Sequence, residues 1–138
     1  LGADIKEGPG RVHQHDSPEQ LYRRPATETV ARLTGEVITL EADARGATAT
    51  HALGEVTLMA PHQGAVRLML RPEQLRFHDD PQGDARVTRR AFEGALVRLS
   101  VESPVGTFSI EVSAHDAPEL DTRGRVSIND AVWALPVP

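Results

Sequence analysis

The stretch GAVRLMLRPEQLR, residues 64–76, decides the fold of this 138-residue chain. Aliphatic side chains stand at every second position from Val66 to Leu70, with Arg and Met between them. A period of two places them on one face, which is the pattern of a half-buried β-strand. Arg71, Pro72 and Glu73 then end the strand, because proline fixes φ and has no backbone N–H to donate.

The turn at Arg71-Pro72-Glu73 has two interpretations. The Arg71 guanidinium is a planar fork of donors that suits a carboxylate, either Glu73 or one on a partner chain. A structural turn with a local salt bridge is the simpler interpretation.

Outward from this stretch, the chain after Gly35 continues as short apolar runs separated by turn residues. Turns are predicted at Arg45-Gly46 and Gln63-Gly64, and a break at Leu53-Gly54. A long hairpin is predicted around residues 103–106, and two final short strands around Asn129-Asp130, a pair that tolerates positive φ.

Many short strands at near-regular spacing predict a mainly β fold, a small barrel or sandwich of antiparallel strands. Two clusters, about residues 36–78 and 86–136, flank a polar loop near residues 79–85. Two halves of one barrel and two small OB-like units both fit this pattern.

Two short helices are predicted before the β region. Ser17 can cap a helix that begins with Pro18 and ends before Pro25. Thr27 can cap a second helix, which Gly35 ends. Before them, Gly8-Pro9-Gly10 predicts a turn between two short strands.

Composition excludes several classes of protein. The chain contains no cysteine, so disulfides, thiolate metal sites and a cysteine nucleophile are ruled out. The net charge of −5 argues against nucleic acid as a partner. No apolar run approaches the length of a membrane helix, so direct insertion into a membrane is not expected.

No catalytic motif is present. The P-loop, GxGxxG, HExxH and GxSxG patterns are all missing, and we expect neither catalytic residues nor a bound cofactor in this chain. The candidate metal ligands are His13, His15, His51, His62, His78 and His115, and the carboxylates Asp79, Asp80 and Asp84. Solvated side chains explain them better than a metal site, because the spacings lack any ligand pattern.

The motif Arg71-Pro72-Glu73 resembles the "RPE" strand of the C-terminal regulatory (TOBE, OB-like) domain of ABC-transporter ATP-binding subunits. Further segments resemble that family in the same order along the chain. They are Gly10-Arg11-Val12, Tyr22 to Pro25, the helix at residues 30–35, Phe92-Glu93-Gly94 and Gly124-Arg125-Val126. Gly35-Glu36-Val37 and Gly54-Glu55-Val56 look most like the ferric-iron importers, while polyamine, maltose and related sugar importers share the architecture.

The resemblance implies that residues 1–35 are the tail of a nucleotide-binding domain with its connecting helices, and that residues 36–138 are the regulatory domain. The Walker A, signature and Walker B motifs are absent and the chain starts at Leu1, so we expect an excised C-terminal segment without ATPase activity. ATP and magnesium would belong to the parent chain, which would work with membrane permease subunits on the cytoplasmic face of the plasma membrane. Whether residues 1–35 dock on the β region, swap onto a second copy or stay mobile is left open.

The expected function of the segment is dimerisation or regulation of the parent. Its candidate self-contact residues are Leu96, Leu99, Val101, Phe108 and Ile110. Two other hypotheses remain open: a stand-alone OB-like module that binds oxyanions or oligonucleotides, and a metal sensor that uses His78 and Asp79.

Overall fold

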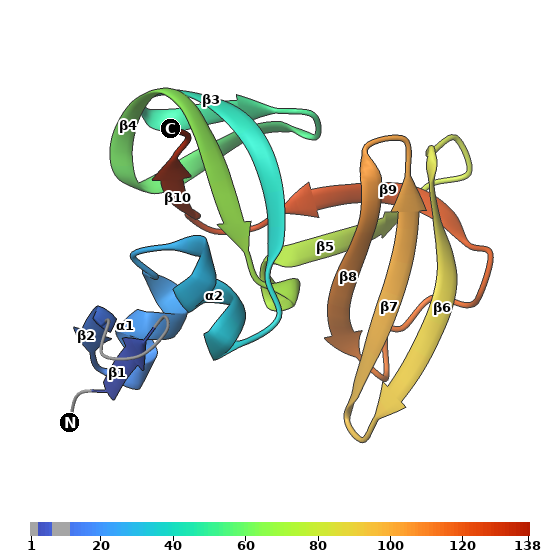
Figure 1. Ribbon diagram of the computed structural model, residues 1–138. Coiled ribbons are helices and arrows are strands. Elements are labelled where there is room, and N and C mark those ends of the chain that lie inside the picture. The colour runs from blue at the N-terminus through green and yellow to red at the C-terminus, as the bar shows by residue number, and fades with distance from the viewer. Residues whose placement is uncertain (1–2, 7–11) are drawn as a thin grey trace. The chain divides into compact units, whose positions relative to one another are not determined.

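A computed structural model describes the backbone of residues 3–6 and 12–138 and the side chains from Asp16 onward. The chain is mainly β with two short helices near its N-terminus, as predicted (Figure 1). Its elements are β1 (Ala3–Lys6), β2 (Val12–Asp16), α1 (Pro18–Arg23), α2 (Glu28–Thr34), β3 (Ile38–His51), β4 (Gly54–Leu70), the 3-10 helix η1 (Pro72–Gln74), β5 (Leu75–Asp79), β6 (Ala85–Glu93), β7 (Leu96–Ser103), β8 (Gly106–Ser113), β9 (Arg123–Ile128) and β10 (Trp133–Pro136).

The strands form three sheets, ordered β1-β2, β10-β4-β3 and β5-β9-β6-β7-β8. The β1–β2 pair, the β10–β4 pair and the pairs of the five-stranded sheet are antiparallel, as expected for an OB-like fold. β8 comes close to η1 and β5, so the five-stranded sheet curls around its core. None of the sheets closes into a complete barrel within the described part of the chain.

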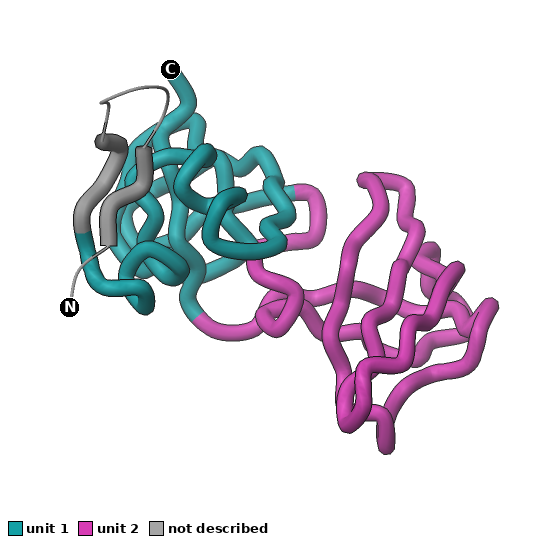
Figure 2. Tube along the Cα trace, turned by 60° about the horizontal axis from the view of Figure 1, so that its bottom comes forward, with its two compact units in different colours: residues 1–51, 56–70, 131–138 teal, residues 52–55, 71–130 magenta. Residues whose placement is uncertain are grey.

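The chain divides into two compact units (Figure 2). The first contains the chain up to His51, Val56–Leu70 and Ala131–Pro138; the second contains Ala52–Glu55 and Arg71–Asp130. The two units differ from the two clusters predicted at residues 36–78 and 86–136. Strands join a unit according to the strands they pair with, and not according to nearness in the sequence. β5 pairs with β9 and so joins the second unit, whereas β10 pairs with β4 in the first.

Both predicted helices are confirmed, including their caps. Ser17 Oγ accepts the Gln20 N–H at 3.3 Å, and Thr27 Oγ1 accepts the Val30 N–H at 3.2 Å. Each cap satisfies a donor that the first helical turn leaves without a partner. The buried residues Leu21, Val30 and Ala31 attach both helices to the first unit.

The turns predicted at Gly46 and Gly64 are wrong. β3 and β4 run through these positions without reversing, and the two glycines adopt φ values of +70° and +90° inside the strands. Glycine tolerates this backbone conformation because it has no Cβ, so a long strand can bend there and continue. A glycine that bends a strand and one that reverses the chain look alike in sequence.

The hairpin predicted around residues 103–106 is confirmed: β7 and β8 pair from Leu96↔Ser113 to Ser103↔Gly106. The two final strands also form, and Asp130 between them adopts a positive φ of 65°. They do not pair with each other, however. β9 pairs with β5 and β6, and β10 pairs with β4.

Gly124 is a position where the second unit has no room for a side chain. A Cβ added there would overlap the backbone carbonyl of His78 and the ring of Phe77. We therefore expect Gly124→Ala to lower the free energy of unfolding by about 1–3 kcal/mol, as overpacking of a buried site does. Urea denaturation followed by circular dichroism measures the difference.

Gly46→Ala is the matched control. Nothing lies within 4 Å of its added Cβ, so only the positive φ is penalised, at a cost of about 1 kcal/mol. A Gly124→Ala variant no less stable than Gly46→Ala would contradict the close packing around Gly124.

Candidate functional site

The Arg71-Pro72-Glu73 motif lies where the chain leaves the first unit for the second. The Arg71 N–H donates to Gln74 Oε1 at 2.9 Å, and the Gln74 N–H donates back to the Arg71 carbonyl at 2.9 Å. Gln74 in turn accepts the Asn129 N–H at 2.7 Å. Arg71 is only 4% exposed, so its side chain is buried within the described part of the chain, which disfavours a contact with a partner chain. These hydrogen bonds close the local turn at the start of η1.

Four of the five proposed self-contact residues lie in the core of the second unit. Leu99, Val101, Phe108 and Ile110 are buried with exposures of 0–2%, because their faces of β7 and β8 turn inward. A buried core side chain is not available to a second copy. Only Leu96, at 39%, remains accessible.

The structure adds Phe92, which sequence reasoning treated only as part of a motif. Phe92 is 67% exposed and lies near the β6–β7 turn, one position from the Glu93↔Leu96 pair. Leu96 and Phe92 therefore place two large apolar side chains at the same hairpin end. An aromatic residue just before a turn glycine was the available signal. Alternation from Val87 does not place Phe92 on the core-facing side, because only the register shift between Val87 and Arg89 brings it to the face of Val97.

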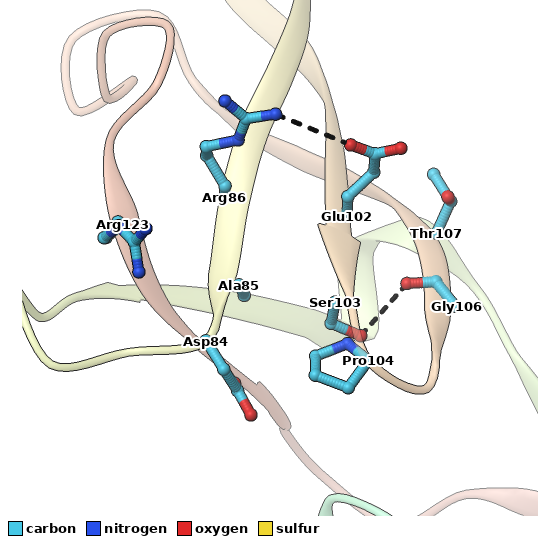
Figure 3. Close-up of a pocket in the computed structure, with 9 residues that line it drawn as sticks. All are labelled: Asp84, Ala85, Arg86, Glu102, Ser103, Pro104, Gly106, Thr107 and Arg123. Atoms are coloured by element: carbon cyan, nitrogen blue, oxygen red, sulfur yellow. Dashed lines mark hydrogen bonds and ion pairs between the residues drawn. The ribbon is translucent and has the colours of Figure 1, made fainter.

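A polar hollow of about 400 Å³ lies in the second unit, between β6, β9 and the β7–β8 turn (Figure 3). Its lining residues are Asp84, Ala85, Arg86, Glu102, Ser103, Pro104, Gly106, Thr107 and Arg123. Arg86 lies 3.3 Å from Asp121 and 3.9 Å from Glu102, so carboxylates of this chain already balance its charge. Figure 3 shows Ser103 turned toward the Gly106 carbonyl, to which its hydroxyl donates at 3.0 Å. The hollow holds no nucleophile paired with a general base.

Two of the candidate metal ligands, His78 and Asp80, make local polar contacts. His78 Nε2 is 2.7 Å from Ser127 Oγ, and Asp80 pairs with Arg125 at 2.9 Å. Burial lowers the pKa of His51 below its ordinary value, because desolvation disfavours the charged ring. Among the described side chains, no group of three or more His, Asp and Glu residues could hold a metal ion. His13 and His15 fall outside the described side chains.

Polar contacts attach the helices to the first unit. Arg67 on β4 bonds to Glu28 at 3.0 Å and to Glu41 at 2.8 Å, while Arg32 bonds to Glu28 at 2.7 Å. The hydrogen bonds from Arg32 and then Arg67 hold the pKa of Glu28 below its usual range. A second contact joins β10 to the segment before α2, where Trp133 Nε1 donates to the Pro25 carbonyl at 2.8 Å.

Comparison with known families identifies the second half of the chain. Residues 68–135 match the family model of the TOBE domain. This range begins in β4, contains the Arg71-Pro72-Glu73 motif and ends in β10. In the described part of the chain, no helix is long and apolar enough to cross a membrane.

The curated relatives are ATP-binding subunits. The Fe(3+) ions import ATP-binding protein FbpC of Pseudomonas fluorescens is 34% identical over 94% of this chain and 40% of its own length. Proteins of the same name from Serratia marcescens and Yersinia pseudotuberculosis are 31% and 40% identical, over 87% of this chain in each case. This chain spans about a third to two fifths of the length of these relatives. The predicted resemblance is confirmed.

Glu28 should contribute stability that depends on pH. A carboxylate with a lowered pKa stabilises the fold fully above its ordinary pKa, and the contribution disappears as the pH falls through the lowered value. We expect Glu28→Gln to cost about 0.5 kcal/mol at pH 7, a figure reduced for solvent screening. The difference from the unmodified chain should close in acid, as measured by urea denaturation across pH.

Glu19→Gln is the control, because within the described part of the chain Glu19 pairs only with Arg23, at 3.3 Å and in an exposed position. Its effect should be smaller at pH 7. A Glu28→Gln penalty that persists unchanged into acid would refute the assigned role of the Glu28 carboxylate.

Proposed function

We propose that this chain, which carries a TOBE domain and is related to ATP-binding subunits of ferric-ion importers, is the regulatory and dimerisation module of such a subunit. The observation that supports this most directly is the exposed hairpin end of the second unit. Phe92 and Leu96 are 67% and 39% exposed there, beside a well-packed core. Phe92 pairs with Val97 and Leu96 with Glu93, so the two side chains leave opposite faces of the same hairpin end. Exposed large apolar side chains are typical of interaction surfaces.

Such a module would act by keeping two subunits together. If the segments remain paired while the ATP sites open and close, each catalytic domain stays at a high effective concentration beside the other. The chain has no catalytic machinery of its own in the proposed role. ATP and magnesium would be bound by the parent, and permease subunits would hold the complex at the cytoplasmic face of the membrane.

The described aromatic side chains favour this role over binding of oligonucleotides. An OB-like domain that binds single strands presents aromatic rings on which bases stack. Phe108 is buried at 2% exposure. Trp133 donates a hydrogen bond to the Pro25 carbonyl, and Cζ of Arg24 lies 5.6 Å from the centroid of its ring. Among the described aromatic residues only Phe92 is strongly exposed, at 67%, and one ring is not a stacking surface for successive bases. The net charge of −5 also offers no electrostatic attraction.

Self-association of the 138-residue chain is the first test. Sedimentation equilibrium over a wide concentration range is expected to reveal a reversible dimer. Phe92→Ser should weaken it, whereas Val105→Ser, which removes a 43% exposed apolar side chain at the other end of β7, should not. A chain that remains monomeric at the highest concentration would overturn the dimerisation role.

The substrate of the parent is tested in cells. We propose ferric iron, with polyamines or sugars as the alternative, from the names of the relatives. Deleting the parent gene should abolish uptake of ferric iron and leave uptake of polyamines and maltose unchanged. Loss of polyamine or maltose uptake, with ferric uptake intact, would reassign the importer.

A further inference from the structure

The second half of β6 has an open edge. β6 pairs with β7 along its length, but β9 pairs with it only at Ala85 and Arg86. Backbone bonds with Thr122 and Asp121 extend this contact as far as Val87. Within the described part of the chain, residues 88–93 therefore have a strand neighbour on one side only. An unpaired strand edge is a template for a further strand.

The exposed ring of Phe92 lies at this open edge. Phe92 is paired with Val97, so it shares the face of the sheet that covers the core further along β7. Val97 is buried at 5% exposure and Phe92 is 67% exposed, which places Phe92 just beyond the end of the core. β6 is the outer member of the β8-β7-β6 group on that side (Figure 1).

The backbone pattern fixes which groups point outward. Gly94 and Ala95 join the strands as a two-residue turn, and Glu93↔Leu96 is the pair that flanks it. In such a hairpin the flanking pair is hydrogen bonded, and the bonded pairs then alternate along the ladder. The N–H and C=O groups of Arg90 and Phe92 therefore point away from β7, toward the open edge.

We propose that a second copy of this chain pairs its own β6 edge with this one, antiparallel about a two-fold axis at Ala91. The inference rests on the proposed dimerisation and specifies its surface. Arg90 then bonds through its backbone to the partner's Phe92, and each Arg89 faces the partner's Glu93. The two small Ala91 side chains meet at the axis, where the strands approach most closely.

Charge complementarity selects this register. Only registers centred on a residue are possible, because the outward-pointing groups of both strands must meet. A centre at Arg90 would place two Arg90 side chains opposite each other, and a centre at Phe92 would leave both arginines facing the Gly94-Ala95 turn. The centre at Ala91 gives two Arg–Glu pairs and sets each Arg90 beside an aromatic ring, both of which are favourable.

The free length of the β6 edge also matches the length of the incoming strand. In this register the partner's hairpin turn comes opposite Thr88, next to Val87, where the bonds to Thr122 and Asp121 begin. The incoming strand therefore ends where the existing pairing starts. Arg90 already lies 3.7 Å from Glu119, a long and exposed contact that leaves its side chain able to turn.

Charge reversal tests the register. Arg89→Glu and Glu93→Arg each create two like-charge pairs in the dimer and should weaken association about tenfold. The double variant Arg89→Glu/Glu93→Arg restores opposite charges and should recover most of it. Because Glu93→Arg also removes a 3.8 Å contact with Arg98, recovery in the double variant separates the two effects. Circular dichroism confirms that each variant is folded.

Oxidative cross-linking tests the axis. The chain has no cysteine, so Ala91→Cys introduces a single thiol that meets its own copy at a distance suited to a disulfide. Mild oxidation should yield covalent dimers rapidly with Ala91→Cys and slowly with Thr107→Cys, an exposed position on β8. If the unmodified chain dimerises but neither charge reversal nor Ala91→Cys has an effect, the β6 edge is not the dimer surface. The proposed dimerisation would still hold. A monomeric unmodified chain would overturn both.

Discussion

The pairing of β10 with β4 is the constraint on which this architecture depends. Trp133↔Met69 and Pro136↔Val66 mark the ends of a ladder that joins the last strand to the middle of the chain. Residues 71–130 therefore form a unit inserted between two neighbouring strands of the first unit. The Trp133 hydrogen bond to Pro25 then attaches the helical segment to the same strand. β10 therefore contacts both β4 and the segment before α2 within the first unit.

Local physical chemistry was enough to predict the features that need only nearby residues. Ser17 and Thr27 cap their helices because a side-chain oxygen three residues away satisfies an N–H. The β7–β8 hairpin follows from alternation on both sides of a turn. The TOBE resemblance came from motif residues, above all Arg71-Pro72-Glu73, and in the structure the backbone of Arg71 is hydrogen bonded to Gln74 across this turn.

Long-range strand pairing and surface exposure could not be predicted from the sequence. Nothing near Trp133 in the chain specifies β4 as its neighbour, and Gly64 looks like a turn whether the strand reverses or bends. Alternation gave Leu99 and Ile110 a common inward face, but it cannot say whether that face meets a core or a partner. Phe92 escapes burial only because β6 continues past the core, which is a property of three-dimensional packing.

The late position of β10 has a consequence for synthesis on the ribosome. The inserted unit, Arg71–Asp130, emerges in full before Trp133 does, so it can fold while the first sheet still lacks a strand. During that interval the backbone edge of β4 that pairs with β10 has no strand beside it. The first unit is therefore completed only after the inserted unit, and a chain cut before Trp133 would hold a folded insertion beside a sheet that lacks β10.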